Sequence, residues 1–378
     1  MTVESFVRRL ARPRFSERRI KELALERFKN VTELEITNIL NKLKLEKSGV
    51  SNIECEKLKR ELDFYKKEYE VFKEKRNIID EVISLCRANI QPLEEPAKIK
   101  FTEKDSRLLS ETAVLLLSDL HLGFNVSELE APCKDMVYNI EIASEKMIKL
   151  IKSFIDIITE KRNTRNIKNL VICFIGDIVE GNWLTINQTK DDIVKQIFNG
   201  VKIVSGIISE TSKYFDKINI YCVYGNHGVI QKGQPDYVNW DYIFYRFLEE
   251  TLSGFETIEI EIPTIPYHVF EILNHKYCIM HGGNIRMFYR TPYYGIETAD
   301  INLKAILGRF GVSYDVLILG HFHQPAFLPT QSGVVIMNGS LTGFTPFGFK
   351  IQRFYPANQV CFGVHPNHKI TWVYSLEV

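Results

Sequence analysis

Short runs of apolar, β-prone residues recur along the C-terminal two thirds of this chain and alternate with helical patterns. The runs are AVLLL (113–117), LVICFI (170–175), INIYCVY (218–224), KYCIM (276–280), DVLIL (315–319) and GVVIM (333–337). Helical patterns cover residues 137–160 and 191–214. Strands that are apolar throughout and separated by helices are typical of an α/β sheet buried on both faces. We therefore predict an α/β domain over residues 112–378.

The first hundred residues have helical periodicity instead. Ile20 and Leu23 follow helical spacing, and a capping box of Thr32 and Glu35 begins a second amphipathic helix. We predict a basic, helix-turn-helix-like module over residues 1–50. Its two helices fit either a reader of DNA or a small packing module.

A heptad pattern follows this module. Over residues 55–86 two series of apolar positions repeat every seven residues, and Arg76 is their one charged member. The pattern predicts a long coiled-coil-like helix over residues 51–91, packed against a second copy, a partner protein or its own body. Two prolines then end the helix, and residues 92–111 form a predicted linker.

Charge is unevenly distributed along the chain. The 378 residues carry a formal charge of only +1, but residues 1–30 hold nine basic and four acidic side chains. Such an arm suits contact with a phosphate backbone, and equally a solvated helix face.

The seven cysteines form no CxxC pair, so we expect reduced thiols. No apolar run approaches the roughly 20 residues that cross a bilayer, so we expect a cytoplasmic protein with no membrane partner, in the host cytoplasm if a virus encodes it.

A polar block follows each predicted strand. In chain order the blocks are SDLHLG (118–123), GDIVEG (176–181), GNHG (225–228), HGG (281–283), GHFH (320–323) and NGS (338–340). Because strand ends of an α/β sheet converge on one crevice, we expect the blocks to form one site. Asp, His and Asn side chains suit Mn²⁺, Fe or Zn²⁺, and the lack of cysteine argues against structural zinc. One block alone is an ordinary turn, but six in order predict a metal centre.

This order of blocks resembles the calcineurin-like metallophosphoesterase family, whose signature is DxH, GDxx(E/D), GNH(D/E), a later His and GHxH. The resemblance covers about residues 112–345. It implies a β-sandwich flanked by helices and two divalent metal ions, Mn²⁺ foremost, with Fe, Zn or Ni as alternatives. It implies that one ion is held by Asp119, His121, Asp177 and His323, and the other by Asp177, Asn226, His281 and His321.

The implied reaction is hydrolysis of a phosphate ester. Two cations neutralise the phosphate oxygens and lower the pKa of a water shared between them. His227, free of metal, faces the substrate and protonates the leaving oxygen. One position departs from the signature, since Gly228 stands where the family has Asp or Glu. Either another acid orients His227, with Asp241 as the candidate, or the imidazole is held more loosely and its pKa is raised less. We also predict Asp241 among the substrate-binding residues.

The metal motifs do not identify the substrate. The basic arm, the helical extension and the insertion HGGNIRMFYRTPYYG favour nucleic acid. In that insertion Arg286 and Arg290 are candidate phosphate contacts, and four aromatic side chains are candidates for base stacking. The C-terminal NGSLTGFTPFGFKIQRFYPANQVCFGV is similar to the close of phage- and virus-type metallophosphoesterases grouped with DNA repair exonucleases.

Three functions therefore compete. The leading one is a dinuclear-metal phosphodiesterase that acts as a nuclease on DNA, with helix 55–86 joining two copies or binding a partner protein. The alternative is a phosphomonoesterase or small-nucleotide phosphodiesterase whose N-terminal helices serve only oligomerisation. A non-catalytic scaffold is disfavoured because the ligand set is complete.

Overall fold

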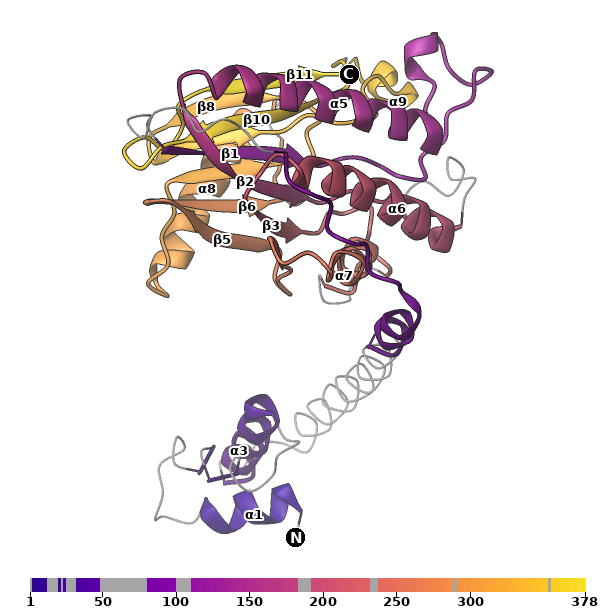
Figure 1. The fold of residues 1–378 in the computed structure, drawn as a ribbon. Helices are drawn as coiled ribbons and strands as arrows, with labels where there is room; N and C mark the ends of the chain where they lie inside the picture. Colours follow the sequence, from indigo (N-terminus) through magenta and orange to yellow (C-terminus); the bar gives the residue numbers. More distant parts are fainter. Residues whose placement is uncertain are drawn as a thin grey trace. The chain divides into compact units, whose positions relative to one another are not determined.

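The computed structural model describes residues 2–11, 20–21, 23–24, 32–47, 80–99, 110–182, 192–231, 237–287, 291–352 and 355–378. Contacts divide the chain into two compact units, Met1–Ile78 and Ile79–Val378 (Figure 1). Most of the predicted heptad helix, residues 51–79, lies outside the described residues. None of the described helices is long and apolar enough to cross a membrane.

The first unit contains α1 (Val3–Leu10) and α3 (Glu33–Lys47). The predicted capping box is confirmed at the start of α3. The backbone N–H of Thr32 donates to the Glu35 carboxylate at 2.9 Å, and the N–H of Glu35 donates to the Thr32 hydroxyl at 3.3 Å. A small apolar core joins the segments of this unit, made of Val7, Ile20, Ala24, Ile36 and Leu40. That this unit reads DNA stays a prediction.

Two β-sheets form the centre of the second unit (Figure 1). The first sheet has the order β11-β10-β1-β2-β3-β4, and the second has the order β5-β6-β7-β9-β8. The first sheet consists of β1 (Ser110–Leu117), β2 (Asn166–Ile175), β3 (Lys217–Val223), β4 (Ile258–Glu261), β10 (Asn358–Val364) and β11 (Val373–Glu377). The second consists of β5 (Tyr267–Ile272), β6 (His275–Met280), β7 (Val316–Leu319), β8 (Ala326–Thr330) and β9 (Gly333–Met337). The runs β1-β2-β3-β4 and β6-β7-β9 are parallel, so the carboxyl ends of these strands gather at one edge of each sheet.

Helices cover both outer faces of the sandwich, which confirms the predicted architecture. The first sheet packs against α5 (Ile140–Lys161), α6 (Ile193–Ser212) and α7 (Trp240–Thr251), and the second against α8 (Tyr293–Gly308). Two short helices, η1 (Lys134–Met136) and α9 (Pro346–Lys350), lie in connections. The core between the sheets includes Val114, Leu116, Val171, Tyr277, Ile279 and Phe362.

All six apolar runs that we predicted to be strands are strands. Two strands without an apolar run, β4 and β10, show why the run is absent. At the sheet edge, β4 alternates half-buried and exposed residues. In β10 the buried Gln359 is polar, because its side-chain amide pairs with both the N–H and the C=O of Ser118.

Residues 80–99 pack on the body of the second unit. Ile83 and Cys86, at the C-terminal end of the predicted heptad helix, join the core beneath the first sheet's helices. The Lys98 ammonium donates to the carbonyls of Ser212 and Phe215 at 3.2 and 3.0 Å, at the end of α6. Residues 92–99 of the predicted linker therefore pack on the second unit. The end of the predicted long helix also packs on its own chain, through Ile83 and Cys86, as one of the alternatives expected.

Candidate metal centre

The turns that follow five strands carry all the predicted ligands. The structure brings these side chains together, although they are spread over about 200 residues of sequence. Their ligand atoms form three groups, each with all atoms within 4.8 Å of one another. The groups are Asp119, His121 and His323; His121, Asp177 and His227; and Asp177, His281 and His321. His121 and Asp177 each belong to two groups, so the middle group connects the other two, and the carboxylate of Asp177 lies within reach of ligand atoms on both sides.

Five of the predicted ligands lie on left-handed backbone. Their φ angles are 51° at Asp119, 47° at His121, 52° at Asp177, 67° at His321 and 56° at His323. This conformation costs a non-glycine residue roughly 1–2 kcal/mol, and it persists where neighbouring structure fixes it. Here the turns after β1 and β2 fix each other. The N–H of Asp119 donates to the Gly176 carbonyl, and that of His121 to the Asp177 carbonyl, both at 3.0 Å.

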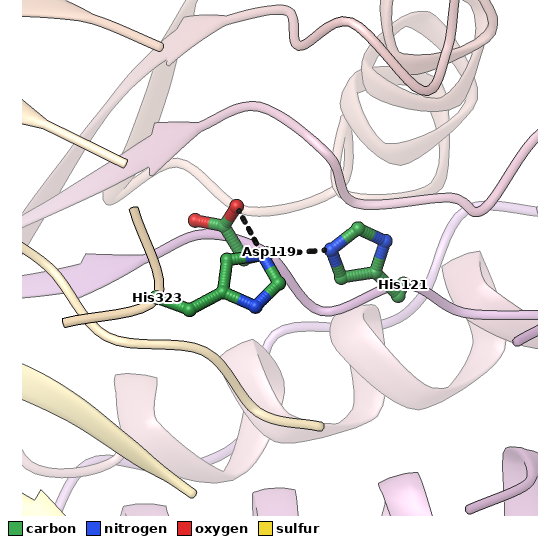
Figure 2. Close-up of side chains that lie close together, drawn as sticks. All are labelled: Asp119, His121 and His323. Carbon is green, nitrogen blue, oxygen red and sulfur yellow. Dashed lines mark hydrogen bonds and ion pairs between the residues drawn. The ribbon is translucent and has the colours of Figure 1, made fainter. Parts of the chain in front are cut away.

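The first cluster comprises Asp119, His121 and His323 (Figure 2). His323 Nε2 lies 3.2 Å from Asp119 Oδ1 and 3.3 Å from His121 Nε2, so the donor atoms converge on one point. The side chains of Asp119 and His121 are buried, whereas that of His323 is 33% exposed. This cluster therefore opens to solvent on the His323 side.

The second cluster comprises Asp177, Asn226, His281 and His321, of which Asp177 and His281 are buried. His281 Nε2 is 3.0 Å from both Asp177 Oδ2 and Asn226 Oδ1. Its other ring nitrogen, Nδ1, donates to the Ile175 carbonyl at 2.8 Å, which leaves Nε2 as the ligand atom. The His321 ring lies 5.1 Å from the His281 ring, centroid to centroid.

Glu180 is a site residue that sequence reasoning missed. Its Oε2 lies 2.6 Å from His121 Nδ1 and 3.2 Å from His227 Nδ1, and its side chain is buried. Burial acts to raise the pKa of Glu180, but the imidazoles of His121 and His227 outweigh it and lower the pKa to about 2. The signal was available, since Glu180 is the closing acid of the GDIVEG block. Glu180 thus places a carboxylate within ion-pair distance of His227, where Gly228 provides none.

Asp241 does not have either role that we predicted for it. Its side chain is fully buried and its carboxylate accepts backbone N–H groups, so it contacts neither substrate nor the His227 ring. Burial, and next the charge of Asp177, raise its pKa to about 6. Arg286 is exposed on the loop after β6, as a substrate contact requires, and Arg290 lies outside the described residues.

The charge distribution fits divalent cations. Burial acts to raise the pKa of Asp119 and Asp177, but imidazoles, foremost His323 and His281 respectively, keep both pKa values below the ordinary range. Conversely, burial acts to lower the pKa of His281, but Asp177 raises it to about 9. Carboxylate oxygens, an amide oxygen and imidazole nitrogens in a buried cluster without thiolates are ligands that first-row divalent ions prefer.

His227 is the predicted proton donor. Its side chain is 20% exposed, more open than those of Asp177, Glu180 and His281. Burial acts to lower its pKa, but the charge of Asp177 and the contact with Glu180 raise the pKa to about 10. The carboxylates of Asp177 and Glu180 thus favour the protonated form of this imidazole.

The model of the calcineurin-like phosphoesterase family matches residues 112–325, which is more than half of the chain. The chain belongs to the calcineurin-like phosphoesterase family. This phosphoesterase is thus a metal-dependent hydrolase of phosphoric esters, and the family's divalent ions fit the donor set of the two clusters.

Solved structures show distant likeness to this phosphoesterase. A novel archaeal phosphodiesterase has 14% identity and a TM-score of 0.33, over 70% of this chain and 99% of the other. Vacuolar protein sorting 29 from Cryptosporidium parvum has 13% identity and a TM-score of 0.32, over 71% and 100%. A hypothetical protein from Pyrococcus horikoshii OT3 has 15% identity and a TM-score of 0.37, over 70% and 88%. No curated protein sequence matches the chain.

Proposed function

We propose that this phosphoesterase is a nuclease that hydrolyses the phosphodiester bonds of DNA with two Mn²⁺ ions. The observation that carries the proposal is an exposed basic and aromatic segment beside both ligand clusters. We call residues 283–287 and 291–295 the rim segment. When bound, the two ions neutralise phosphate oxygens and provide hydroxide at neutral pH.

Side chains of this chain perform the remaining tasks. Asp119, His121 and His323 would hold one ion, Asn226, His281 and His321 would hold the other, and Asp177, within 4.8 Å of both His121 and His281, would serve both. His227 donates a proton to the leaving oxygen from the open side of the site, and Glu180 orients its ring. Because the proton goes to an oxygen, the same arrangement serves any phosphodiester.

The rim segment is tied to both clusters. At its start, a Cβ added to Gly283 would lie 2.6 Å from Asn226 Oδ1, so its backbone packs directly on the second cluster. Further along, Gln324 Nε2 donates to the Tyr293 hydroxyl at 2.6 Å, and Gln324 follows His323 of the first cluster. Groups exposed on this segment therefore lie next to the phosphate that the clusters bind.

The exposed groups of the rim segment suit a polynucleotide. The Arg286 side chain is exposed and provides a bidentate donor for a neighbouring phosphate. The Tyr294 side chain is 65% exposed and offers a flat face on which a base can stack. A small phosphomonoester needs neither contact. The basic arm of residues 1–30 adds further phosphate contacts, and helix 55–86 joins two copies or binds a partner protein.

The first test compares substrate classes. With Mn²⁺, we expect hydrolysis of bis-p-nitrophenyl phosphate to exceed that of p-nitrophenyl phosphate, and end-labelled single- or double-stranded DNA to be cut. Activity on the monoester alone would overturn the proposal. A chain without residues 1–78 should keep its activity on bis-p-nitrophenyl phosphate and lose affinity for DNA, with a smaller dependence on salt.

The second test separates the rim segment from the metal centre. Arg286→Ala should raise KM for DNA and leave hydrolysis of bis-p-nitrophenyl phosphate unchanged. Arg309→Ala is the matched control, because Arg309 is an exposed arginine at the other end of α8, about 24 Å along the helix from Tyr293. Equal effects of the two variants on DNA cleavage would exclude a specific role of the rim segment.

A further inference from the structure

Asp241 lies beneath the turns of the second cluster, in the first turn of α7, and its side chain is 0% exposed. The carboxylate accepts four backbone N–H groups. Its Oδ2 accepts from Asp177 and Gly225, both at 2.9 Å, and its Oδ1 accepts from Ile178 at 3.0 Å and Val179 at 3.1 Å. One carboxylate therefore joins the turn after β2 to the turn after β3.

Asn239 completes the connection. Its side-chain amide donates to the Gly225 carbonyl at 2.8 Å, and its amide oxygen accepts the N–H of Asp241 at 2.8 Å, which caps α7. A Cβ added to Gly228 would lie 2.0 Å from this oxygen. The Asn239 side chain thus occupies the space into which any side chain at position 228 would extend.

The two joined turns carry ligands that must share one ion. Asp177 is on left-handed backbone, and Asn226 directly follows Gly225. The turns touch, since a Cβ added to Gly176 would lie 2.5 Å from the Gly225 nitrogen. Strained backbone of this kind keeps its shape only where surrounding bonds fix it. The four bonds of Asp241 supply that constraint at Asp177 and at Gly225.

We propose that Asp241 is a positioning residue, which together with Asn239 holds Asp177 and Asn226 at the spacing that binds the second ion. It acts through the backbone and touches neither ion nor substrate. The start of α7 suits this role, because a helix N-terminus stabilises a buried carboxylate. The proposal concerns metal binding and is independent of the substrate.

The substitution Asp241→Asn tests the role with little change in shape. It replaces one acceptor oxygen by an NH₂ group that faces backbone N–H donors, so two of the four bonds are lost. The matched control is Asp300→Asn. Asp300 is likewise 0% exposed, and its carboxylate accepts from Tyr314 at 2.8 Å and Lys304 at 3.2 Å, on α8 away from the ligand turns.

Isothermal titration with Mn²⁺ and thermal unfolding of the metal-free chain are the measurements. Both variants should lower Tm, and only Asp241→Asn should weaken Mn²⁺ binding, by about 10–100-fold. In ¹⁵N NMR spectra the amides of Asp177 and Gly225 should shift in Asp241→Asn and not in Asp300→Asn. Unchanged Mn²⁺ affinity in folded Asp241→Asn, or equal weakening in both variants, overturns the proposal.

A second pair of variants covers the case in which Asp241→Asn does not fold. Gly228→Ala should weaken Mn²⁺ binding because its methyl group displaces Asn239. In an Asn239→Ala background the methyl group no longer meets the Asn239 amide, and only the 3.1 Å approach to the Asp241 nitrogen remains, so the same substitution should weaken binding less. If the effects of the two substitutions simply add, Asn239 does not transmit the constraint and the proposal fails.

Discussion

The two ligand clusters orient their imidazoles in different ways. In the first, His121 Nδ1 faces the charged carboxylate of Glu180, which also contacts His227. In the second, His281 Nδ1 donates to a neutral backbone carbonyl, that of Ile175. Each cluster combines a buried imidazole, His121 or His281, each 5% exposed, with a half-buried one, His323 or His321.

This difference indicates a division of labour. A carboxylate partner makes an imidazole more basic and couples it to charge nearby, whereas a carbonyl mainly fixes the ring. Glu180 thus contacts both a predicted ligand of the first cluster, His121, and the proposed proton donor, His227, whereas the contact of His281 with Ile175 involves no charge. Asp177 belongs to the second cluster, and its carboxylate also lies within 4.8 Å of His121 of the first, so substitutions at Asp177, His227 and Glu180 separate the two roles.

The largest effect is expected at the shared ligand. Asp177→Ala removes the carboxylate that belongs to the second cluster and lies within 4.8 Å of His121 of the first, and with it the Oδ1 that accepts the backbone N–H of His227 at 2.8 Å. We expect loss of both ions and of measurable hydrolysis. Metal content by mass spectrometry and hydrolysis of bis-p-nitrophenyl phosphate are the measurements. Retention of a full metal complement would contradict the bridging role.

His227→Ala should have the next largest effect, and on turnover alone. Removing a general acid costs typically about 10²–10⁴-fold in kcat. His227 occurs in only one of the three groups of potential ligands, with His121 and Asp177. Each of those two residues also belongs to a group without His227, so metal content should stay at the wild-type level. If His227→Ala loses metal as Asp177→Ala does, His227 is a ligand and the comparison of the clusters must be redrawn.

Glu180→Gln should affect one cluster and spare the other. The amide keeps the size of the side chain but loses the charge that orients His121 and His227. We expect one Mn²⁺ affinity to fall by about 10–100-fold, and kcat to fall as well. The other affinity should remain, because His281 is oriented by a backbone carbonyl. Calorimetric titration resolves the two sites, and equal weakening of both would show that the clusters are not independent.

The smallest expected effect concerns the strained backbone. His121 has a φ of 47°, whereas His281 is not among the residues with positive φ. His121→Gly should therefore be more stable than His121→Ala by about 1 kcal/mol, because glycine adopts this conformation freely. At His281 the order should reverse. Thermal unfolding of the four metal-free variants tests this, and the same order at both positions would exclude strain at His121.

The sequence predicted the parts of this molecule that are encoded locally. Six strands are apolar runs, and every predicted ligand lies in the polar block that follows one of them, so both were identifiable without tertiary information. Glu180 and Asp241 show where this reasoning ends. Both are acids near a turn that carries a predicted ligand. Only the packing of the turn after β2 and of α7 decides that Glu180 faces an imidazole and that Asp241 faces backbone N–H groups.

The half-buried strands were missed for a related reason. In β4 only every second residue faces the interior, and four residues are too few for alternation to be distinctive. The substrate is harder still to predict, because the metal motifs report the phosphate and not what is attached to it.

The contacts of residues 80–99 determine the smallest fragment of the chain that can fold by itself. A chain shortened to residue 112 would uncover the apolar surface that Ile83 and Cys86 occupy, and would free the carbonyls that Lys98 caps at the end of α6. Proteolysis should accordingly leave a resistant product that begins before residue 80. For evolution this means that the phosphoesterase domain can be exchanged intact between proteins only together with residues 80–99.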